Sequence, residues 1–372
     1  MKCICQRICL TVLIFACHNQ LAATSPASNG SWQFRAAGLS YISDVLVKPN
    51  GEVFIASAPD GAVIQLDATG NLAQEISTRG PGPGELMGPV GLDYLPANDT
   101  LVIADARKLK LLHFGSDGRF LNAWPVPHIQ LNGRMFGDGL IAFTTDQLAV
   151  PKPNQGVTLY RFDLAASEDP SISNQKNQWR TLLEFDAKAH ADPQKMPGKG
   201  NNFIRFPWAP RVLVAKAWDD RHLIIGSNVN VDFAWVDVKK GEVTGRIKHD
   251  FPRLPLTTAE IDDHLRQRAN RLRASYRATQ FKNPEFKPVT ERINADLTDR
   301  LWIKLQRPFQ VEESRHVVFS KDGAKVGQIL LPANVKVINA NTEFVWLSYF
   351  DEQSDAWTVE KRAFRLTPIA EK

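Results

Sequence analysis

The stretch Asn98-Asp99-Thr100-Leu101-Val102-Ile103-Ala104-Asp105 joins a polar turn to a short apolar strand. Asp, Asn and Gly suit such a turn because they accept left-handed or side-chain-capped backbone geometry. The β-branched and apolar residues that follow suit a half-buried strand. Five further copies of this pattern lie at 50–56, 137–143, 219–226, 298–303 and 341–347. The repeat predicts an all-β chain built from similar units.

A second half-motif follows several copies of the first at a similar offset. It consists of a strand, a tight turn and an outer strand, and it is found at 63–70, 111–118, 233–241 and 317–323. Two such hairpins per repeat make a four-stranded antiparallel unit, which cannot bury both of its faces alone. Neighbouring units must therefore stack on one another. This organisation predicts a β-propeller.

The spacing of the copies predicts the number of blades. Successive first-strand anchors are 48, 39, 83, 78 and 43 residues apart, counted between Phe54, Val102, Ile141, Ile224, Trp302 and Val345. Because a blade needs about 40 to 50 residues, the two long intervals predict insertions at about 165–200 and 251–288. We therefore expect one six-bladed propeller domain over 32–366. Residues 32–39 are expected to add an outer strand to the last blade, which ends at 357–366.

The N-terminal segment predicts export. All four cysteines lie within the first 17 residues, where the basic Lys2 and Arg7 precede an apolar stretch at 8–16. This is the pattern of a signal peptide, expected over 1–23. Two ways of processing the signal peptide remain open. Residues 14–17 resemble a lipobox, which would lead to lipidation of Cys17, and residues 21–23 form a small-residue site for ordinary cleavage. Either route places the protein in the periplasm or cell envelope, soluble or attached to a membrane through its lipidated N-terminus. The exported chain then has no cysteine pair for a disulfide.

Composition excludes several classes of protein. Of the 372 residues, 43% are hydrophobic and 23% are charged, which excludes global disorder. The sequence contains no run of about 18 apolar residues, which excludes a multi-span membrane protein. The net charge of +5 falls to +3 without Lys2 and Arg7, which is too weak to indicate a nucleic-acid partner. We expect a monomer.

Several stretches resemble a known group of proteins. The stretch Arg79-Gly80-Pro81-Gly82-Pro83-Gly84-Glu85-Leu86 is followed by Pro89, by 101–105, and by Phe114 and 118–120, with later matches at 286–288 and 299–303. This pattern resembles bacterial six-bladed propellers related to NHL-repeat and TolB-like proteins. The resemblance implies an exported propeller. Relatives include ligand-binding sensors, scaffolds and a minority of hydrolases or lyases, so the fold alone does not assign a function.

Several sequence features could be mistaken for catalytic or phosphate-binding motifs. The glycines of 79–86 lack the Gly-Lys-Ser/Thr ending of a phosphate loop, and their neighbouring prolines remove backbone donors, which favours a connection between blades. No Gly-x-Ser-x-Gly, His-Glu-x-x-His or paired-cysteine motif follows the signal segment. His113, His222 and His316 lie in strand or turn copies and are expected to be structural.

Candidate ligand-binding residues are those just upstream of the repeated turns, because a propeller normally binds ligands where its innermost strands begin. Arginine side chains there suit an anionic or sugar-like ligand, whereas carboxylates and an amide suit a hard cation such as calcium. Alternatively, the same residues form ion pairs within the channel. No other cofactor is evident. The candidates are Asp44, Asp93, Arg134, Arg211, Arg292 and Asn294.

One amphipathic helix is expected at 257–281, inside the second insertion. Thr257 and Glu260 fit a capping box, and the apolar positions fall on one face. The family resemblance implies that such an insertion covers the propeller as a lid or docking element, and a membrane-surface contact, an acidic partner and a solvated basic face also remain open. The apolar face carries Ile261, Leu265, Leu272 and Tyr276, and the other carries Arg266, Arg268, Arg271, Arg273 and Arg277. Four aromatic residues suit either a sugar-binding rim or a core: Phe206, Trp208, Trp218 and Trp235.

These observations favour one function over another. We expect an exported binding or scaffold protein of the cell envelope that holds a small-molecule or protein ligand at the mouth of the propeller. The alternative is a hydrolase or lyase that uses mouth carboxylates and a divalent cation. The scattered histidines favour the binding protein, and no enzyme activity is assigned.

Overall fold

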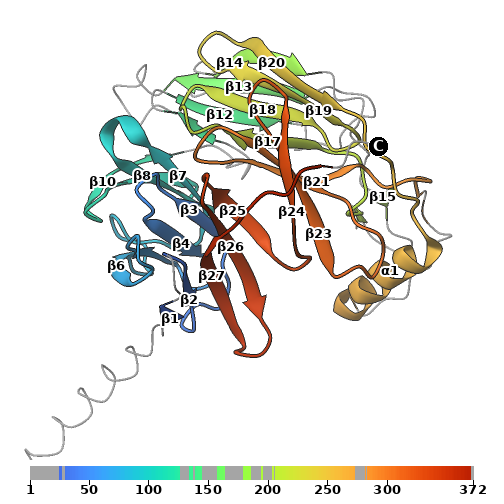
Figure 1. Ribbon diagram of the computed structural model, residues 1–372. Coiled ribbons are helices and arrows are strands. Elements are labelled where there is room, and N and C mark those ends of the chain that lie inside the picture. The colour runs from blue at the N-terminus through green and yellow to red at the C-terminus, as the bar shows by residue number, and fades with distance from the viewer. Residues whose placement is uncertain are drawn as a thin grey trace, which may run out of the picture. The chain divides into compact units, whose positions relative to one another are not determined.

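A computed structural model describes residues 25–26, 30–125, 206–272, 281 and 283–369, and the backbone of six further strands between 134 and 204. The chain divides into two compact units. Figure 1 labels the strands and the helix of both. One comprises Met1–Leu131 with Val335–Phe364, and the other comprises Asn132–Asn334 with Arg365–Lys372. All pairings between the named strands are antiparallel, so the predicted all-β class is confirmed.

In the first unit, two sheets each consist of four strands that follow one another in sequence and in space. The strands of the first sheet are β3 (Asp44–Val47), β4 (Val53–Ser57), β5 (Ala62–Leu66) and β6 (Leu72–Ser77). Those of the second are β7 (Pro89–Leu95), β8 (Thr100–Asp105), β9 (Lys110–Gly115) and β10 (Phe120–Pro125). A 3₁₀ turn at Pro96–Asn98 joins β7 to β8.

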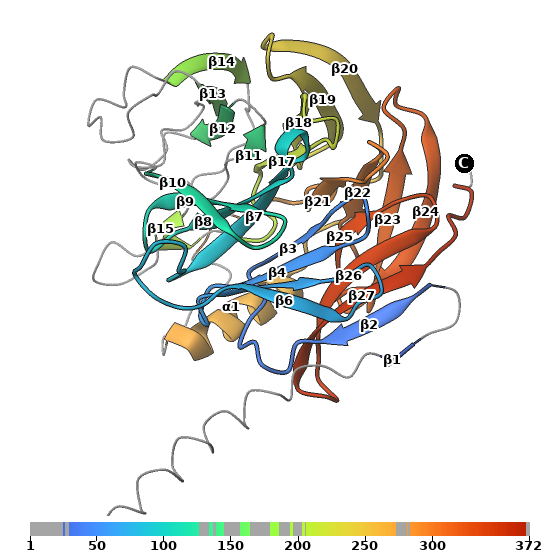
Figure 2. The ribbon, with the colours of Figure 1, turned by 90° about the vertical axis from the view of Figure 1, so that its left-hand side faces the viewer.

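The third sheet of this unit contains strands from both ends of the described chain. It combines β25 (Lys336–Ala340), β26 (Phe344–Asp351) and β27 (Ala356–Ala363) with β2 (Trp32–Arg35) and β1 (Ser25–Pro26). Strand β2 pairs with β27 over its whole length (Figure 2). The predicted outer strand from residues 32–39 is thus confirmed, and Phe34 is fully buried.

The second unit holds three more four-stranded sheets with the same strand order. Their strands are β11 (Arg134–Phe136), β12 (Gly139–Thr144), β13 (Val157–Asp163) and β14 (Trp179–Phe185); β17 (Val212–Lys216), β18 (His222–Ser227), β19 (Val231–Asp237) and β20 (Glu242–His249); and β21 (Thr290–Ala295), β22 (Leu301–Leu305), β23 (Glu313–Phe319) and β24 (Lys325–Pro332). A separate pair is formed by β15 (Gln194–Lys195) and β16 (Phe203–Ile204). Strand β14 lies inside the insertion expected at 165–200, so part of that segment is the outer strand of a sheet.

These sheets are the blades of an all-β propeller of four-stranded antiparallel blades. Five sheets have four strands, whereas the sheet that holds β2 has five because β1 adds to its edge. The prediction of six four-stranded blades is therefore not confirmed as stated.

Buried aspartates stabilise tight turns between successive strands, at β8–β9, β19–β20 and β21–β22. Asp105, Asp237 and Asp296 are fully buried. Each accepts hydrogen bonds from backbone N–H groups two to four residues further on, at 2.9 to 3.1 Å. Because an unpaired buried N–H costs about 1–3 kcal/mol, a carboxylate at this position stabilises the tight turn. The strand that follows can then enter the core directly.

The glycine-rich stretch at 79–86 connects β6 to β7. The backbone N–H of Gly82 donates to the Glu85 carboxylate at 2.6 Å, and Lys108 Nζ donates to the carbonyls of Gly82 and Glu85 at 2.9 and 2.7 Å. The anion bound by the backbone of this loop is therefore the carboxylate of its own Glu85. This geometry agrees with a connection between blades.

Helix α1 (Thr258–Leu272) is shorter than the helix expected at 257–281, and residues 273–280 lie outside the described part. The backbone N–H of Glu260 donates to Thr257 Oγ1 at 3.2 Å, which gives one half of the predicted capping box. Ile261 and Leu265 pack on Phe206, Trp208 and Phe281. The predicted apolar face of α1 is therefore confirmed at these two positions, whereas Leu272, Tyr276 and the arginines beyond Arg266 lie outside the described side chains. Within the described residues, no helix is long and apolar enough to span a membrane.

Candidate functional site

Asp44 and Asp93, the two predicted carboxylates, lie on first strands of the first unit. Asp44 Oδ2 accepts from the backbone N–H of Leu92 on β7 at 3.0 Å, and its Oδ1 lies 3.8 Å from Lys336 Nζ on β25. Asp44 thereby links three sheets. Asp93 Oδ1 accepts from the backbone N–H of Tyr94 at 2.8 Å.

The predicted arginines and Asn294 belong to the second unit. Arg134 begins β11, whose side chains lie outside the described part. Arg211 immediately precedes β17, and it donates through its backbone N–H to Asn228 Oδ1 at 2.8 Å and through its guanidinium to the Glu291 carbonyl at 2.6 Å. Arg292 and Asn294 lie on β21. The six candidates are thus divided between the two units.

A cavity of about 490 Å³ lies in the second unit, where β17 and β21 begin. Its wall includes Arg211 from the predicted set, together with Glu291 on β21 and the segment 306–310 that follows β22. Glu260 and Asp263 of α1 line the same cavity. Arg292 and Asn294 do not line it. A volume of this size falls within the range of roughly 300–1,000 Å³ that is typical of small-molecule sites.

A buried ion pair holds α1 at the wall of this cavity. Lys287 is 2% exposed, and its Nζ lies 3.0 Å from Glu260 Oε1 and 2.6 Å from the Arg307 carbonyl. Glu291, another residue of the wall, pairs with Lys304, with 2.9 Å between Glu291 Oε1 and Lys304 Nζ. These charges are compensated by protein groups, which lowers the cost of holding them away from water.

Two residues of the cavity wall, Glu260 and Trp208, each have one buried polar atom with no hydrogen-bond partner within the described part of the chain. These atoms are Glu260 Oε2, an acceptor, and Trp208 Nε1, a donor. Trp208 is 3% exposed and stacks on Phe206 at 5.0 Å between ring centroids, so its ring belongs to the core beneath α1. Buried polar atoms are almost always paired by protein, water or ligand. Both atoms are inaccessible to solvent, so a molecule in the cavity would reach them only after a side-chain rearrangement.

Next to the cavity, three basic residues form a row across β21, β22 and β23. Arg292 pairs with Lys304, and Lys304 pairs with His316. Burial, followed by the charges of Lys304 and Arg292, lowers the pKa of His316 to about 3. His316 is consequently neutral near pH 7.

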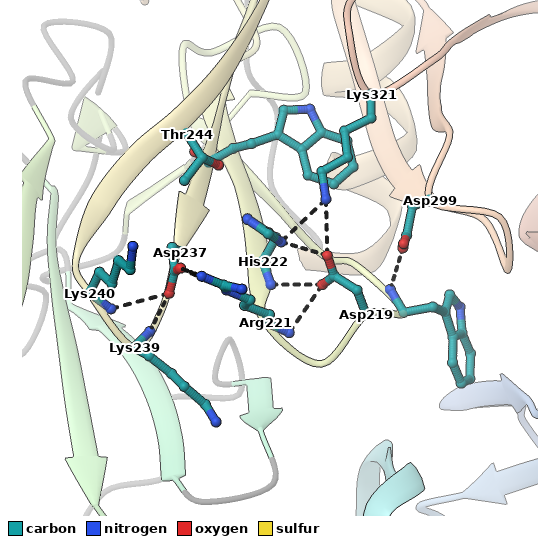
Figure 3. A network of polar contacts seen from close by, with 11 residues as sticks. Asp219, Arg221, His222, Asp237, Lys239, Lys240, Thr244, Asp299 and Lys321 are labelled. Carbon is teal, nitrogen blue, oxygen red and sulfur yellow. Dashed lines mark hydrogen bonds and ion pairs between the residues drawn. The ribbon is translucent and has the colours of Figure 1, made fainter.

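A second polar network lies at the opposite ends of these strands (Figure 3). Asp219 accepts from His222 Nδ1 at 2.5 Å and from Lys321 Nζ at 3.0 Å, and Lys321 lies 5.1 Å from the centre of the Trp235 ring. Arg221 pairs with the buried Asp237 at 2.7 Å. The network connects the turn after β17 to the turn after β23, and it is well explained as a link between two sheets.

Part of the cavity wall was predicted from the sequence. Arg211 was a candidate by its position, Trp208 as an aromatic residue of a rim or a core, and Glu260 as part of a capping box. Lys287 was not predicted, although it lies in the stretch 286–288 that carried the family resemblance. Among the described residues, no group of three or more His, Cys, Asp or Glu side chains is placed to hold a metal ion. Calcium binding stays a prediction.

Comparisons with known proteins identify solved structures of low sequence identity but no family. No protein-family model matches the chain, and no curated protein matches it. The NHL-repeat and TolB-like resemblance is thus not confirmed. A candidate exported protein of Bacteroides fragilis NCTC 9343 is 10% identical, with 93% of this chain and 94% of that one covered and a TM-score of 0.49.

Two further solved structures are similar at the same level. A member of the DUF4221 family from Bacteroides vulgatus ATCC 8482 is 12% identical, with 94% and 100% covered and a TM-score of 0.48. A virginiamycin B lyase from Staphylococcus aureus, solved with quinupristin, is 12% identical, with 92% and 94% covered and a TM-score of 0.41. No activity is transferred from proteins this distant.

Proposed function

We propose that this chain is an exported propeller of six blades that binds a small molecule in the cavity beside α1. The five-stranded sheet serves as the sixth blade, because its first four strands from the inside, β25, β26, β27 and β2, repeat the order of the other five. The additional β1 covers the outer edge of that blade.

The cavity is the observation that carries the proposed function. It lies where the first strands of two neighbouring sheets begin, and its wall contains the predicted Arg211 together with the amide side chains of Gln306 and Gln310. Concave sites with a few convergent polar groups are the usual location for small ligands.

Export is proposed from the N-terminal segment. The basic, apolar and small-residue regions of 1–23 have the order of a signal peptide. We expect the full chain, produced in bacteria, to be recovered from the periplasmic or membrane fraction. Recovery of the uncleaved chain in the cytoplasm would contradict export.

Ligand-induced stabilisation tests the binding function. The chain from residue 24 is heated with 10 mM maltose, citrate, glycylglycine or spermidine, four probes that differ in charge. A molecule that binds only the folded protein raises the midpoint of unfolding by mass action. We expect at least one probe to do so, and we expect Gln306→Trp, which fills the cavity, to abolish the shift.

A matched variant controls for the added indole. Lys240→Trp places the same side chain on an exposed turn, where it should leave the shift unchanged. The proposed function is wrong if no probe raises the midpoint, or if the shift survives in Gln306→Trp.

A further inference from the structure

We propose that a second cavity of the second unit binds an amphiphilic anion, namely a carboxylate with an aliphatic chain of the medium-chain fatty acid class. This site goes beyond the proposed function, because most of its wall differs from that of the cavity beside α1. The inference follows from the apolar surface of the second cavity, from the charged side chains of its wall and from the strand register that places the two side by side.

The second cavity has a volume of about 290 Å³ and lies beside β23 and β24. It shares only the segment 306–308 with the cavity beside α1. Most of its wall is apolar, with contributions from Phe251 and Leu254 after β20. Val311 and Leu330 of the wall are 39% and 57% exposed. Exposed apolar side chains that are grouped around one cavity indicate a surface for a ligand.

The charged side chains of this wall are Arg307, Arg315 and Glu313. Within the described part of the chain, none of the three forms an ion pair. The Arg307 guanidinium donates to the Val311 carbonyl, and Arg315 Nε donates to Gln328 Oε1 at 2.5 Å. Both bonds go to neutral groups, so neither guanidinium charge is compensated by a carboxylate of the protein. A carboxylate of the ligand would accept charge-assisted hydrogen bonds there.

A further cation lies near the apolar part of the wall. Lys325 Nζ is 5.7 Å from the centre of the Phe251 ring. Cationic side chains therefore outnumber the single carboxylate of Glu313 around this cavity, which favours an anion over a cation. Glu313 would in turn repel a second negative charge, so a ligand with one carboxylate suits the wall better than a dianion.

The strand register places the cationic and apolar surfaces next to each other. Arg315 on β23 lies directly opposite Leu330 on β24. Directly opposite residues project from the same face of a sheet, with their Cβ atoms about 4.5–5.5 Å apart. A carboxylate held by Arg315 would thus have its aliphatic chain against Leu330. This juxtaposition is what an amphiphile requires.

Calorimetric titration with amphiphiles of one chain length tests the head group. Octanoate, octanol and octylamine are added, below their micelle concentrations, to the chain from residue 24 at 20 mM and 500 mM NaCl. We expect octanoate to bind at least about tenfold more tightly than octylamine, and to bind more weakly at the higher salt because salt screens the arginines. Hexanoate should bind more weakly than octanoate, by up to about fourfold for each buried CH₂ group that it lacks.

Arginine variants test the contact with the carboxylate. Arg315→Gln should weaken octanoate binding about tenfold, because it removes a charged hydrogen-bond donor. Arg315→Lys keeps the charge and should lose less. Arg35→Gln removes an exposed arginine of β2, which does not line the cavity, and should have no effect.

Two matched carboxylates on β24 test the apolar wall. Leu330→Asp places a negative charge beside the aliphatic chain and should abolish octanoate binding. Val326→Asp makes the same change in charge four residues earlier on the strand, at a side chain that is 44% exposed and outside the wall, and should change the affinity less than about twofold. Both side chains are exposed, so the urea midpoints of the two variants should stay close to that of the unmodified chain.

The proposal is wrong if octanoate does not bind, or if octanol or octylamine binds as tightly as octanoate. It is also wrong if Leu330→Asp and Val326→Asp weaken binding equally. None of these results bears on the cavity beside α1, because neither Arg315 nor Leu330 lines that cavity.

Discussion

Asp219 shows at the scale of one residue how the polar turn of the repeat is stabilised. It accepts from the backbone N–H groups of Arg221 and His222 at 3.0 and 2.9 Å, as Asp296, Asn50 and Asn341 accept from backbone N–H groups of their own turns. It also accepts from Lys321 of the neighbouring sheet at 3.0 Å (Figure 3). One side chain therefore closes its own turn and connects two sheets.

The ionisation of Asp219 predicts a dependence of stability on pH. Burial alone would raise its pKa, but hydrogen bonds from His222, Lys321 and the backbone outweigh burial and lower the pKa to about 2. Because the folded pKa lies below the unfolded value of about 3.9, the ionised group stabilises the fold above pH 4, and this contribution is lost as the pH falls towards 2. We expect Asp219→Asn to lower the urea midpoint at pH 7, and we expect this deficit to disappear by pH 2.

Two lysine variants serve as the comparison. Lys321→Met removes only the link between the sheets and should give a smaller deficit with the same pH dependence. Lys240→Met, on an exposed turn, should give none. A deficit of Asp219→Asn that is equal at pH 7 and pH 2 would contradict this account.

At the scale of one element, helix α1 is held in place by an ion pair as well as by its apolar face. Ile261 and Leu265 are buried against Phe206 and Phe281. Lys287, which is almost inaccessible to solvent, pairs with Glu260 in the first turn of the helix. An acidic residue in the first turn also interacts favourably with the helix dipole. The pair therefore fixes the start of α1 at the wall of the cavity.

A double-mutant cycle measures this link. Lys287→Met should destabilise the protein by about 3–5 kcal/mol, because it leaves the Glu260 carboxylate without its partner. Lys287→Met with Glu260→Gln should recover part of the loss, with a coupling of about 1–3 kcal/mol between the two sites. Urea unfolding gives the energies, and amide hydrogen exchange in 258–272 locates the change. Additive losses would show that the pair does not hold the helix.

Short-range sequence patterns were enough to predict the strands and the start of α1. The candidate site was harder to predict because it depends on contacts between residues far apart in the sequence. The turn aspartates and the strands that follow them were recognisable because every contact that defines the turn lies within about four residues. The start of α1 was recognisable for the same reason, through Thr257 and Glu260. The pairing of Glu260 with Lys287 was not, since it joins residues 27 positions apart through tertiary structure. Trp208 suited a core or a site equally well, and the structure buries its ring in the core beneath α1.

At the scale of the whole molecule, one sheet unites the N-terminal and C-terminal parts of the described chain. Gln33 on β2 lies directly opposite Glu360 on β27. Trp32, on the same strand, donates through Nε1 to the Ala68 carbonyl of the adjacent sheet at 3.0 Å. The outer strand is thus fixed both by its ladder and by a neighbouring blade. Its removal would expose the edge of β27, and exposed edges promote aggregation.

An engineered disulfide across this ladder tests how much the joining of the ends stabilises the fold. The chain from residue 24 contains no cysteine, so Gln33→Cys with Glu360→Cys provides the only thiols. Opposite residues of an antiparallel pair have Cα atoms about 4.5–5.5 Å apart, which suits a disulfide. Because the bond closes a loop of 327 residues, we expect about 2–5 kcal/mol of stabilisation over the reduced protein in urea. Asp351→Cys with Ala356→Cys, opposite each other in the β26–β27 hairpin of the same sheet, closes a short loop and should stabilise less. The prediction is wrong if the long-range disulfide forms but stabilises the protein no more than the hairpin disulfide does. Residues 33 and 360 would then stay close together in the unfolded state without the disulfide, and separation of β2 from β27 would not limit unfolding.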